Sequence, residues 1–136
     1  MKGYHVNIEA QVAENDDFRK VLYSGKSLQL ELVSLDVGEV FGEFVLPEND
    51  QLFHIISGIG RINVAGNAYE VKDGDVVIVP AGIKHKAINV HDADHLRMYS
   101  IVAPPHFQDK LQVRSQKEDE KIKGIEFDGT TTEKYL

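Results

Sequence analysis

From residue 28 onward, hydrophobic and polar residues alternate along short runs of the chain. Leu28, Leu30 and Leu32 alternate with the residues at positions 29, 31 and 33, which is typical of a strand with one buried face. Seven more short β-rich runs are expected to form strands: Val40–Leu46, Leu52–Ser57, Arg61–Val64, Ala68–Val71, Val76–Val79, His85–Val90 and Leu96–Val102. Residues typical of turns separate these runs at even spacing, so the pattern predicts an all-β sandwich or barrel.

The two ends of the chain follow other patterns. Residues 8–23 fit either a short helix or a turn that leads into a strand. Beyond Pro104 and Pro105 charged residues dominate, with room for a short helix around Glu118–Lys123 or a loose strand around Ile125–Phe127. We therefore expect a single domain over residues 1–108, including a short N-terminal segment, and a charged tail over 109–136 that builds no core of its own.

Composition narrows the class of protein. A chain of 136 residues that is 42% hydrophobic is long enough for one core. It contains no cysteine, and no apolar run is long enough to cross a bilayer, so we expect a cytoplasmic protein without membrane association. The net charge of −7 repels phosphate backbones, and nucleic-acid binding is therefore not expected.

One motif carries a family resemblance. The run from Gly74 to Asn89 has the spacing glycine, five residues, proline, any residue, glycine, two residues, histidine, three residues, asparagine, and His85 is its histidine. This spacing resembles the second motif of the cupins. The resemblance implies a double-stranded β-helix, the cupin jelly-roll barrel, with Pro80 and Gly82 at a sharp corner before the strand that His85 opens.

The first cupin motif is present as a frame without its usual metal ligands. Gly38 and Gly58 match its glycines and Gln51 stands at its glutamate, but Phe44 and Leu46 stand at its two histidines. Nearly the whole chain resembles small single-domain cupins of the mannose-6-phosphate isomerase-like, RmlC-like group. In that group the first motif reads Glu-x-His-Pro, three residues, Gln, so the resemblance implies a ligand set of which only Gln51 and His85 are kept.

The cupin resemblance also places a candidate pocket. Positions 44, 46, 51 and 85 converge inside such a barrel, and the expected lining of its mouth is Phe44, Leu46, Gln51, Phe53 and His85. One carboxamide and one imidazole hold a divalent metal poorly. No cofactor is therefore expected, and any metal that does bind would use His85 and Gln51.

His85 allows two interpretations. It is either a core-facing histidine whose hydrogen-bonding capacity Gln51 satisfies, or a general base or ligand anchor. No Asp or Glu stands out on the same inner face, and Arg97 is the one cation expected near a sugar phosphate. His54 has the opposite parity to Gln51 and should face away from the pocket.

These features predict a small-molecule binding protein for a sugar-like or partly apolar ligand, with a degenerate metal site. The alternative is a metal-dependent sugar-phosphate isomerase or epimerase, which the isomerase-like resemblance implies and the loss of ligands at Phe44 and Leu46 weakens. A structural or regulatory role through a homodimer, paired along edge strands, is the third hypothesis.

Overall fold

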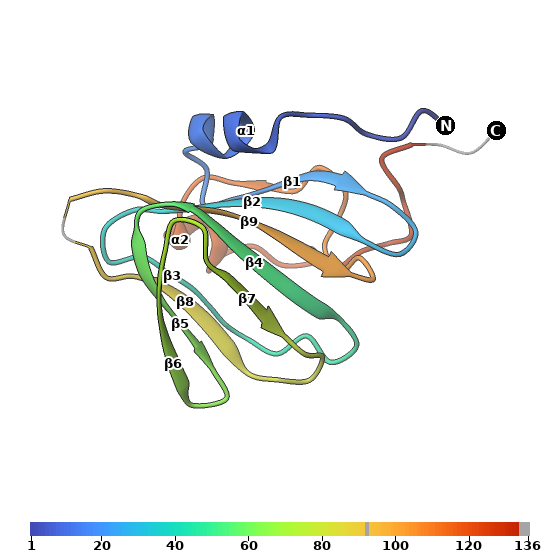
Figure 1. Cartoon of the computed structure of the whole chain (residues 1–136). Coiled ribbons are helices and arrows are strands. Elements are labelled where there is room, and N and C mark those ends of the chain that lie inside the picture. Colours follow the sequence, from blue (N-terminus) through green and yellow to red (C-terminus); the bar gives the residue numbers. More distant parts are fainter. Residues whose placement is uncertain (92, 134–136) are drawn as a thin grey trace.

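The computed structural model describes residues 1–91 and 93–133, and nearly all of its regular structure is β (Figure 1). Its elements in chain order are α1 (Ile8–Glu14), β1 (Arg19–Ser24), β2 (Gln29–Leu35), β3 (Val40–Phe44), β4 (Asp50–Ser57), β5 (Ile59–Val64), β6 (Asn67–Lys72), β7 (Val76–Val79), β8 (His85–Asn89), β9 (Leu96–Ala103), β10 (Gln112–Val113) and α2 (Gln116–Asp119). The predicted all-β class and the β-rich runs from residue 28 to residue 102 are confirmed. The open choice for residues 8–23 resolves into a helix, α1, followed by a strand, β1.

The strands form two antiparallel sheets that face each other (Figure 1). One sheet has six strands in the order β10-β1-β2-β9-β4-β7, and the other has four in the order β3-β8-β5-β6. Apart from the hairpins β1-β2 and β5-β6, neighbours in each sheet are not consecutive in the sequence, as in a jelly roll. The inner faces of the two sheets enclose the main core, which includes Phe41, Phe53, Ile62 and Met98, all inaccessible to solvent.

The face of β2 that points into the core is the unexpected one. Gln29, Glu31 and Val33 are each 0% exposed, whereas Leu28, which precedes the strand on the opposite parity, is 45% exposed. Leu32 is buried on the outer side of the sheet, against which α1 packs. Because both faces of β2 carry apolar residues, the alternation of leucines did not identify the inner face.

The segment after residue 108 packs along the barrel. Val113 in β10 pairs with Arg19 in β1 and belongs to the main core with no exposed surface. The helix predicted around Glu118–Lys123 begins and ends earlier, as α2 (Gln116–Asp119). The predicted strand around Ile125–Phe127 is reduced to one bridge, between Phe107 and Glu126. The charged C-terminal segment therefore completes an edge of the six-stranded sheet.

Candidate functional site

His85 is the centre of the candidate site, and β8 turns its side chain into the barrel. Its Nδ1 lies 2.9 Å from the carbonyl oxygen of Ile83, and its Nε2 lies 2.8 Å from Oε1 of Gln51 on β4. Gln51 in turn donates from its Nε2 to Oγ of Ser100 on β9 at 2.8 Å. The predicted contact between His85 and Gln51 is thus present, and it continues into a chain of three side chains that are each at most 2% exposed.

The protonation state of His85 and the orientation of the Gln51 amide are linked. Both ring nitrogens face carbonyl oxygens, an arrangement that requires a proton on each nitrogen. Burial lowers the pKa of His85, and the hydrogen bond to Ile83 offsets part of this effect. A neutral ring keeps both contacts when the Gln51 amide turns by 180°, so that Gln51 donates to His85 Nε2 and the Ser100 hydroxyl donates to Gln51.

This chain of hydrogen bonds does not fit a metal centre. When both ring nitrogens of His85 carry a proton, Nε2 donates to Gln51. When the ring is neutral, the lone pair of Nε2 accepts a hydrogen bond from the turned Gln51 amide. In neither state is that lone pair free to bind a cation. Phe44 and Leu46 supply no ligand atom, and the described residues contain no group of three or more His, Cys, Asp or Glu side chains placed to hold a metal. The residues present do not fit the cation that the cupin motifs imply.

The predicted lining residues lie at two places in the interior. The rings of Phe44 and Phe53 lie 6.1 Å and 6.0 Å from the His85 ring, centroid to centroid. Leu46 instead packs in a smaller apolar cluster with Val21, Val102 and Phe107. Four of the five predicted residues therefore surround one point, and the fifth belongs to the neighbouring cluster.

Sequence reasoning missed a buried ion pair on the inner face. Arg19 on β1 donates from Nε to Oε2 of Glu31 on β2 at 3.0 Å, and the two side chains are 1% and 0% exposed. Nη1 of Arg19 also lies 3.3 Å from Asp119 in the C-terminal segment. The expectation that no acidic residue faces the interior was wrong, because Glu31 does.

An aromatic cage holds the Arg19 guanidinium. Its Cζ lies 4.1 Å, 4.7 Å and 5.5 Å from the ring centroids of Phe107, Phe41 and Phe44, distances at which the ring faces attract a cation. Burial raises the pKa of Glu31, an effect that the positive charge of Arg19 opposes. The ring of Phe44 neighbours both the Arg19 guanidinium and the His85 imidazole.

Two buried polar atoms of this pair have no hydrogen-bond partner. They are Nη2 of Arg19 and Oε1 of Glu31. A buried donor and a buried acceptor without partners are costly, at about 1–3 kcal/mol each. Parity along β2 was the available signal for Glu31, since it shares a face with Val33 and Leu35. No comparable signal marked Arg19, because residues 19–24 show no clear alternation.

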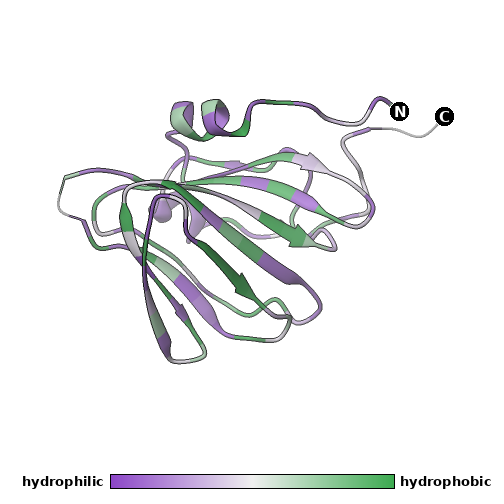
Figure 2. Ribbon diagram, in the orientation of Figure 1, coloured by the Kyte–Doolittle hydropathy of each residue, from purple (hydrophilic) through white to green (hydrophobic). Residues whose placement is uncertain are grey.

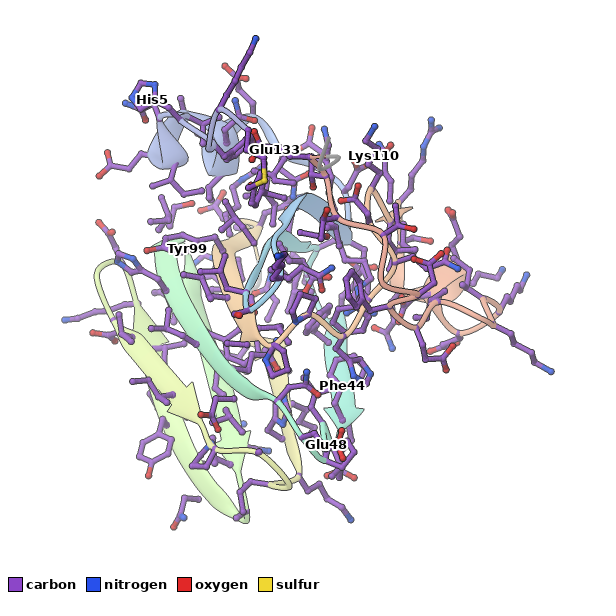
Figure 3. The ribbon with its side chains drawn as sticks, turned by 90° about the vertical axis from the view of Figure 1, so that its right-hand side faces the viewer. His5, Phe44, Glu48, Tyr99, Lys110 and Glu133 are labelled. Carbon is purple, nitrogen blue, oxygen red and sulfur yellow. The ribbon has the colours of Figure 1, made fainter. Side chains whose placement is uncertain are left out.

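The other charged and imidazole side chains lie outside this interior. Arg97, expected near a sugar phosphate, donates instead to Asn15 and to Asp16 beside α1. His54 faces outward as predicted and pairs with the hydroxyl of Tyr99 at 2.9 Å. Figure 3 shows Tyr99 apart from Phe44 and Glu48, which lie near each other lower in the view. Lys84, which precedes His85, is 64% exposed and lies 3.7 Å from the Glu43 carboxylate.

Comparison with known proteins identifies the fold family. The Cupin domain profile matches residues 31–102, which is more than half of the chain. The chain belongs to the cupin family. The described residues contain no helix that is long and apolar enough to cross a membrane.

Proteins similar to this chain come from several lineages. It is 36% identical over 114 residues to the Bacillus subtilis (strain 168) protein YrkC, with 77% of this chain aligned. The chain spans only 59% of the length of YrkC. It is 31% identical to the Acanthamoeba polyphaga mimivirus protein L612, a match that covers 82% of this chain and 72% of L612. Both relatives are described as uncharacterized.

Solved structures agree with this assignment. The crystal structure of BH2720 from Bacillus halodurans is 29% identical and superimposes with a TM-score of 0.85 over 89% of this chain and 96% of its own. An RmlC-like cupin from Shewanella frigidimarina NCIMB 400, at 20% identity and a TM-score of 0.57, covers 63% of this chain and 74% of its own, and shares the fold. The predicted cupin architecture is confirmed.

Proposed function

We propose that this cupin binds a small, uncharged and partly apolar molecule inside its barrel without a metal ion. The observation that carries the proposal is the buried pair of Arg19 and Glu31, with one donor atom and one acceptor atom that have no partner. A hydroxyl or amide group matches both atoms, because it accepts one hydrogen bond and donates another. The rings of Phe41, Phe44 and Phe107 around Arg19 suit an apolar body next to that polar group.

The charges of the site favour an uncharged ligand over a phosphate. Arg19 already faces two carboxylates, Glu31 at 3.0 Å and Asp119 at 3.3 Å. A buried dianion would add negative charge where no uncompensated cation is available among these groups. Arg97 is no substitute, because Asp16 pairs with it at 2.9 Å on the outside of the molecule.

Phe44 is the side chain that has to move for a ligand to enter. Glu31, Gln51 and His85 are each at most 2% exposed, whereas Phe44 is half-buried at the end of β3, where the pairing with β8 is irregular. Its ring contacts both Arg19 and His85. Displacement of this one ring gives a ligand access to both the Arg19 guanidinium and the His85 imidazole.

The isomerase alternative has less support from the geometry. Metal-dependent isomerisation requires a cation to polarise the carbonyl of the sugar, and the residues at positions 44, 46, 51 and 85 do not form a site for one. His85 and Glu31 share the interior, but both ring nitrogens of His85 are already hydrogen-bonded. Mannose 6-phosphate turnover that requires zinc or manganese would restore this alternative.

Thermal unfolding with three matched probes tests the proposal. Phenol carries a hydroxyl on an apolar ring, benzene lacks the hydroxyl, and phenyl phosphate replaces it with a charged group. We expect phenol to raise the melting temperature of the wild type and of Phe44→Ala, with the larger rise in the variant, because removal of the ring makes room for the guest. Benzene should stabilise the variant less, and phenyl phosphate should stabilise neither protein.

Two controls separate the possible outcomes of this experiment. The phenol effect should survive a chelator, and it should disappear in the double variant Arg19→Met and Glu31→Leu, which removes both unpartnered atoms. Equal stabilisation by phenol and benzene would show that the polar pair recognises nothing. Stabilisation that depends on an added divalent cation would contradict a metal-independent site.

A further inference from the structure

The edges of the two sheets lie beside each other on one side of the barrel. β3 is an edge strand of the four-stranded sheet, and β10 followed by β1 forms an edge of the six-stranded sheet. Across this seam the Arg19 guanidinium on β1 lies 4.7 Å from the ring centroid of Phe41 on β3. Residues 115–124, which include α2, join the two edges, and we name them the bridging segment.

Two polar side chains hold the bridging segment to the seam, and we call them its latches, Gln116 and Asp119. The N–H of Val40, the first residue of β3, donates to Oε1 of Gln116 at 2.7 Å, and the N–H of Gln116 donates to Oε2 of Glu39 at 3.0 Å. On the other edge, Nη1 of Arg19 donates to Oδ1 of Asp119 at 3.3 Å. The bridging segment therefore spans the seam from β3 to β1.

Firmer attachments lie just outside the bridging segment. Before it, Val113 is 0% exposed in the main core, and after it the carbonyl oxygen of Ile125 accepts from the N–H of Gln108 at 2.8 Å. Between these points α2 has no buried residue, and Figure 2 shows it as hydrophilic. The half-buried side chain of Ile122 packs against the core. Segments with few buried contacts open locally while the core stays folded.

Asp119 is a counter-charge that Arg19 can release. Its side chain is 17% exposed, whereas those of Arg19 and Glu31 are 1% and 0% exposed. Glu31 stays 3.0 Å from Nε of Arg19 when Asp119 leaves, so the buried guanidinium keeps a counter-charge. Burial is the main cause that raises the pKa of Glu31, and the negative charge of Asp119 adds to it. Departure of Asp119 therefore also removes a repulsion between two carboxylates.

The bridging segment and Phe44 flank the same guanidinium. Asp119 lies 3.3 Å from Nη1 of Arg19, and the ring centroid of Phe44 lies 5.5 Å from its Cζ. Gln116 also holds the first residue of β3, and Phe44 is the last residue of that strand. Release of Gln116 frees one end of the strand that carries Phe44. Movement of the bridging segment and displacement of the Phe44 ring are therefore coupled.

We propose that the bridging segment is a lid over the pair of Arg19 and Glu31, which opens to admit the ligand and closes behind it. This inference rests on the proposed function, because it concerns the route into the same site. Both latches, Gln116 and Asp119, release on opening, and Glu31 keeps Arg19 in place meanwhile. The closed lid shields the pair from water, and hydrogen bonds to a ligand are stronger in such an interior than in water.

Hydrogen exchange of backbone amides, followed by NMR, tests the lid without any ligand. The N–H groups of Val40 and Gln116 take part in the Gln116 latch, whereas the N–H of Val21 donates at 2.8 Å to the carbonyl oxygen of Leu111, before the bridging segment. We expect the first two amides to exchange faster than that of Val21 in the wild type. Equal protection of all three overturns the lid, because the bridging segment then opens only when the whole protein unfolds.

A matched pair of variants identifies the Asp119 latch in the same measurement. Asp119→Asn should accelerate exchange at Val40 and Gln116 by about tenfold and leave Val21 unchanged, the factor expected for loss of one hydrogen bond to a charged group. Glu118→Gln removes the neighbouring exposed carboxylate, which does not pair with Arg19, and should change none of the three. Equal effects of the two variants would show that Asp119 holds nothing closed.

A cross-link tests the lid as the route to the site. The chain has no cysteine, so the double variant Glu39→Cys and Gln116→Cys carries its two thiols at one latch, where a bismaleimide with a short spacer ties them together. The same variant treated with a monofunctional maleimide is the matched control. Para-fluorophenol is the probe, and fluorine NMR measures its rate of entry. We expect entry into the cross-linked protein to be slower by about tenfold or more, because a tied lid does not open.

The outcomes separate failure of the lid from failure of the ligand site. Equal entry rates in the cross-linked and control proteins would show that the probe enters past Phe44 without the lid, and would overturn the inference. Binding of para-fluorophenol to neither form would contradict the proposed function, while hydrogen exchange still decides whether the bridging segment opens. The exchange experiment on the wild type also decides this point if the cysteine variant does not fold.

Discussion

Glu31 holds Arg19 inside the barrel, with Oε2 of the carboxylate 3.0 Å from Nε of the guanidinium and neither side chain in contact with solvent. Removal of one member of such a pair leaves an uncompensated buried charge, whereas removal of both does not. The pair is also the polar part of the proposed ligand site, so it affects both the stability of the protein and the proposed ligand binding. The first prediction separates these two roles.

We expect Glu31→Ala to lower the free energy of unfolding by up to about 3–5 kcal/mol, because the buried Arg19 then keeps only Asp119, at 3.3 Å and 17% exposed, as a counter-charge. The double variant Arg19→Met and Glu31→Leu should recover most of this loss. Urea denaturation measures both. The comparison pair is Arg61 and Glu70, with side chains 41% and 62% exposed, where Glu70→Ala should cost less than about 1 kcal/mol. Equal costs at the two pairs would contradict the burial argument.

The second prediction concerns the pH dependence of stability through His85. Burial lowers the pKa of His85 in the folded state below its usual 6.5. Between that lowered pKa and 6.5 the unfolded chain binds the proton and the folded chain does not, so stability is full above pH 6.5 and falls as the pH drops below it. The fall is at most about 1.4 kcal/mol per pH unit, the limit for one proton.

Urea denaturation of wild type and His85→Gln over this pH range isolates that contribution. The wild type should lose more stability than the variant on acidification, although burial also lowers the pKa of His106 in both proteins. His5→Gln is the control, because His5 is exposed, and its profile should match the wild type. Parallel curves for wild type and His85→Gln would show that His85 is not held in the neutral form.

The third prediction explains why a cupin-motif glycine is required at position 58. Gly58 has φ of +93°, and a Cβ there would lie 2.5 Å from the carbonyl oxygen of His95. Gly66 has a similar φ of +86° but open space around it. Gly58→Ala should therefore destabilise the protein more than Gly66→Ala, since only the former adds a backbone clash to the unfavourable conformation. Thermal unfolding of the two variants under the same conditions tests the order.

The sequence predicted the scaffold better than the site, and particular residues show why. Spacing between Gly74 and Asn89 reports local turns and strands, which depend on near neighbours. Gln51 and His85 were found because a motif gave both positions. The pair of Arg19 and Glu31 depends instead on the order of β1, β2 and β10 in the sheet and on Asp119 in the C-terminal segment. Those contacts follow from tertiary packing, which no local period encodes.

The last prediction concerns the charged segment 109–136, expected from sequence to be a tail. Val113 lies in the core, and Asp119 reaches Arg19 from the same segment. A chain that ends at residue 108 would expose one edge of β1 and lose both contacts, so we expect it to be far less stable than the full chain.

Val113→Ala, which deletes two buried methyl groups, should cost roughly 2 kcal/mol. Asp119→Asn should weaken the contact to Arg19 and cost less than Glu31→Ala, because Asp119 is 17% exposed. Urea denaturation of the three proteins gives the order, and a truncated chain as stable as the full one would establish that residues 1–108 fold independently of the segment that follows.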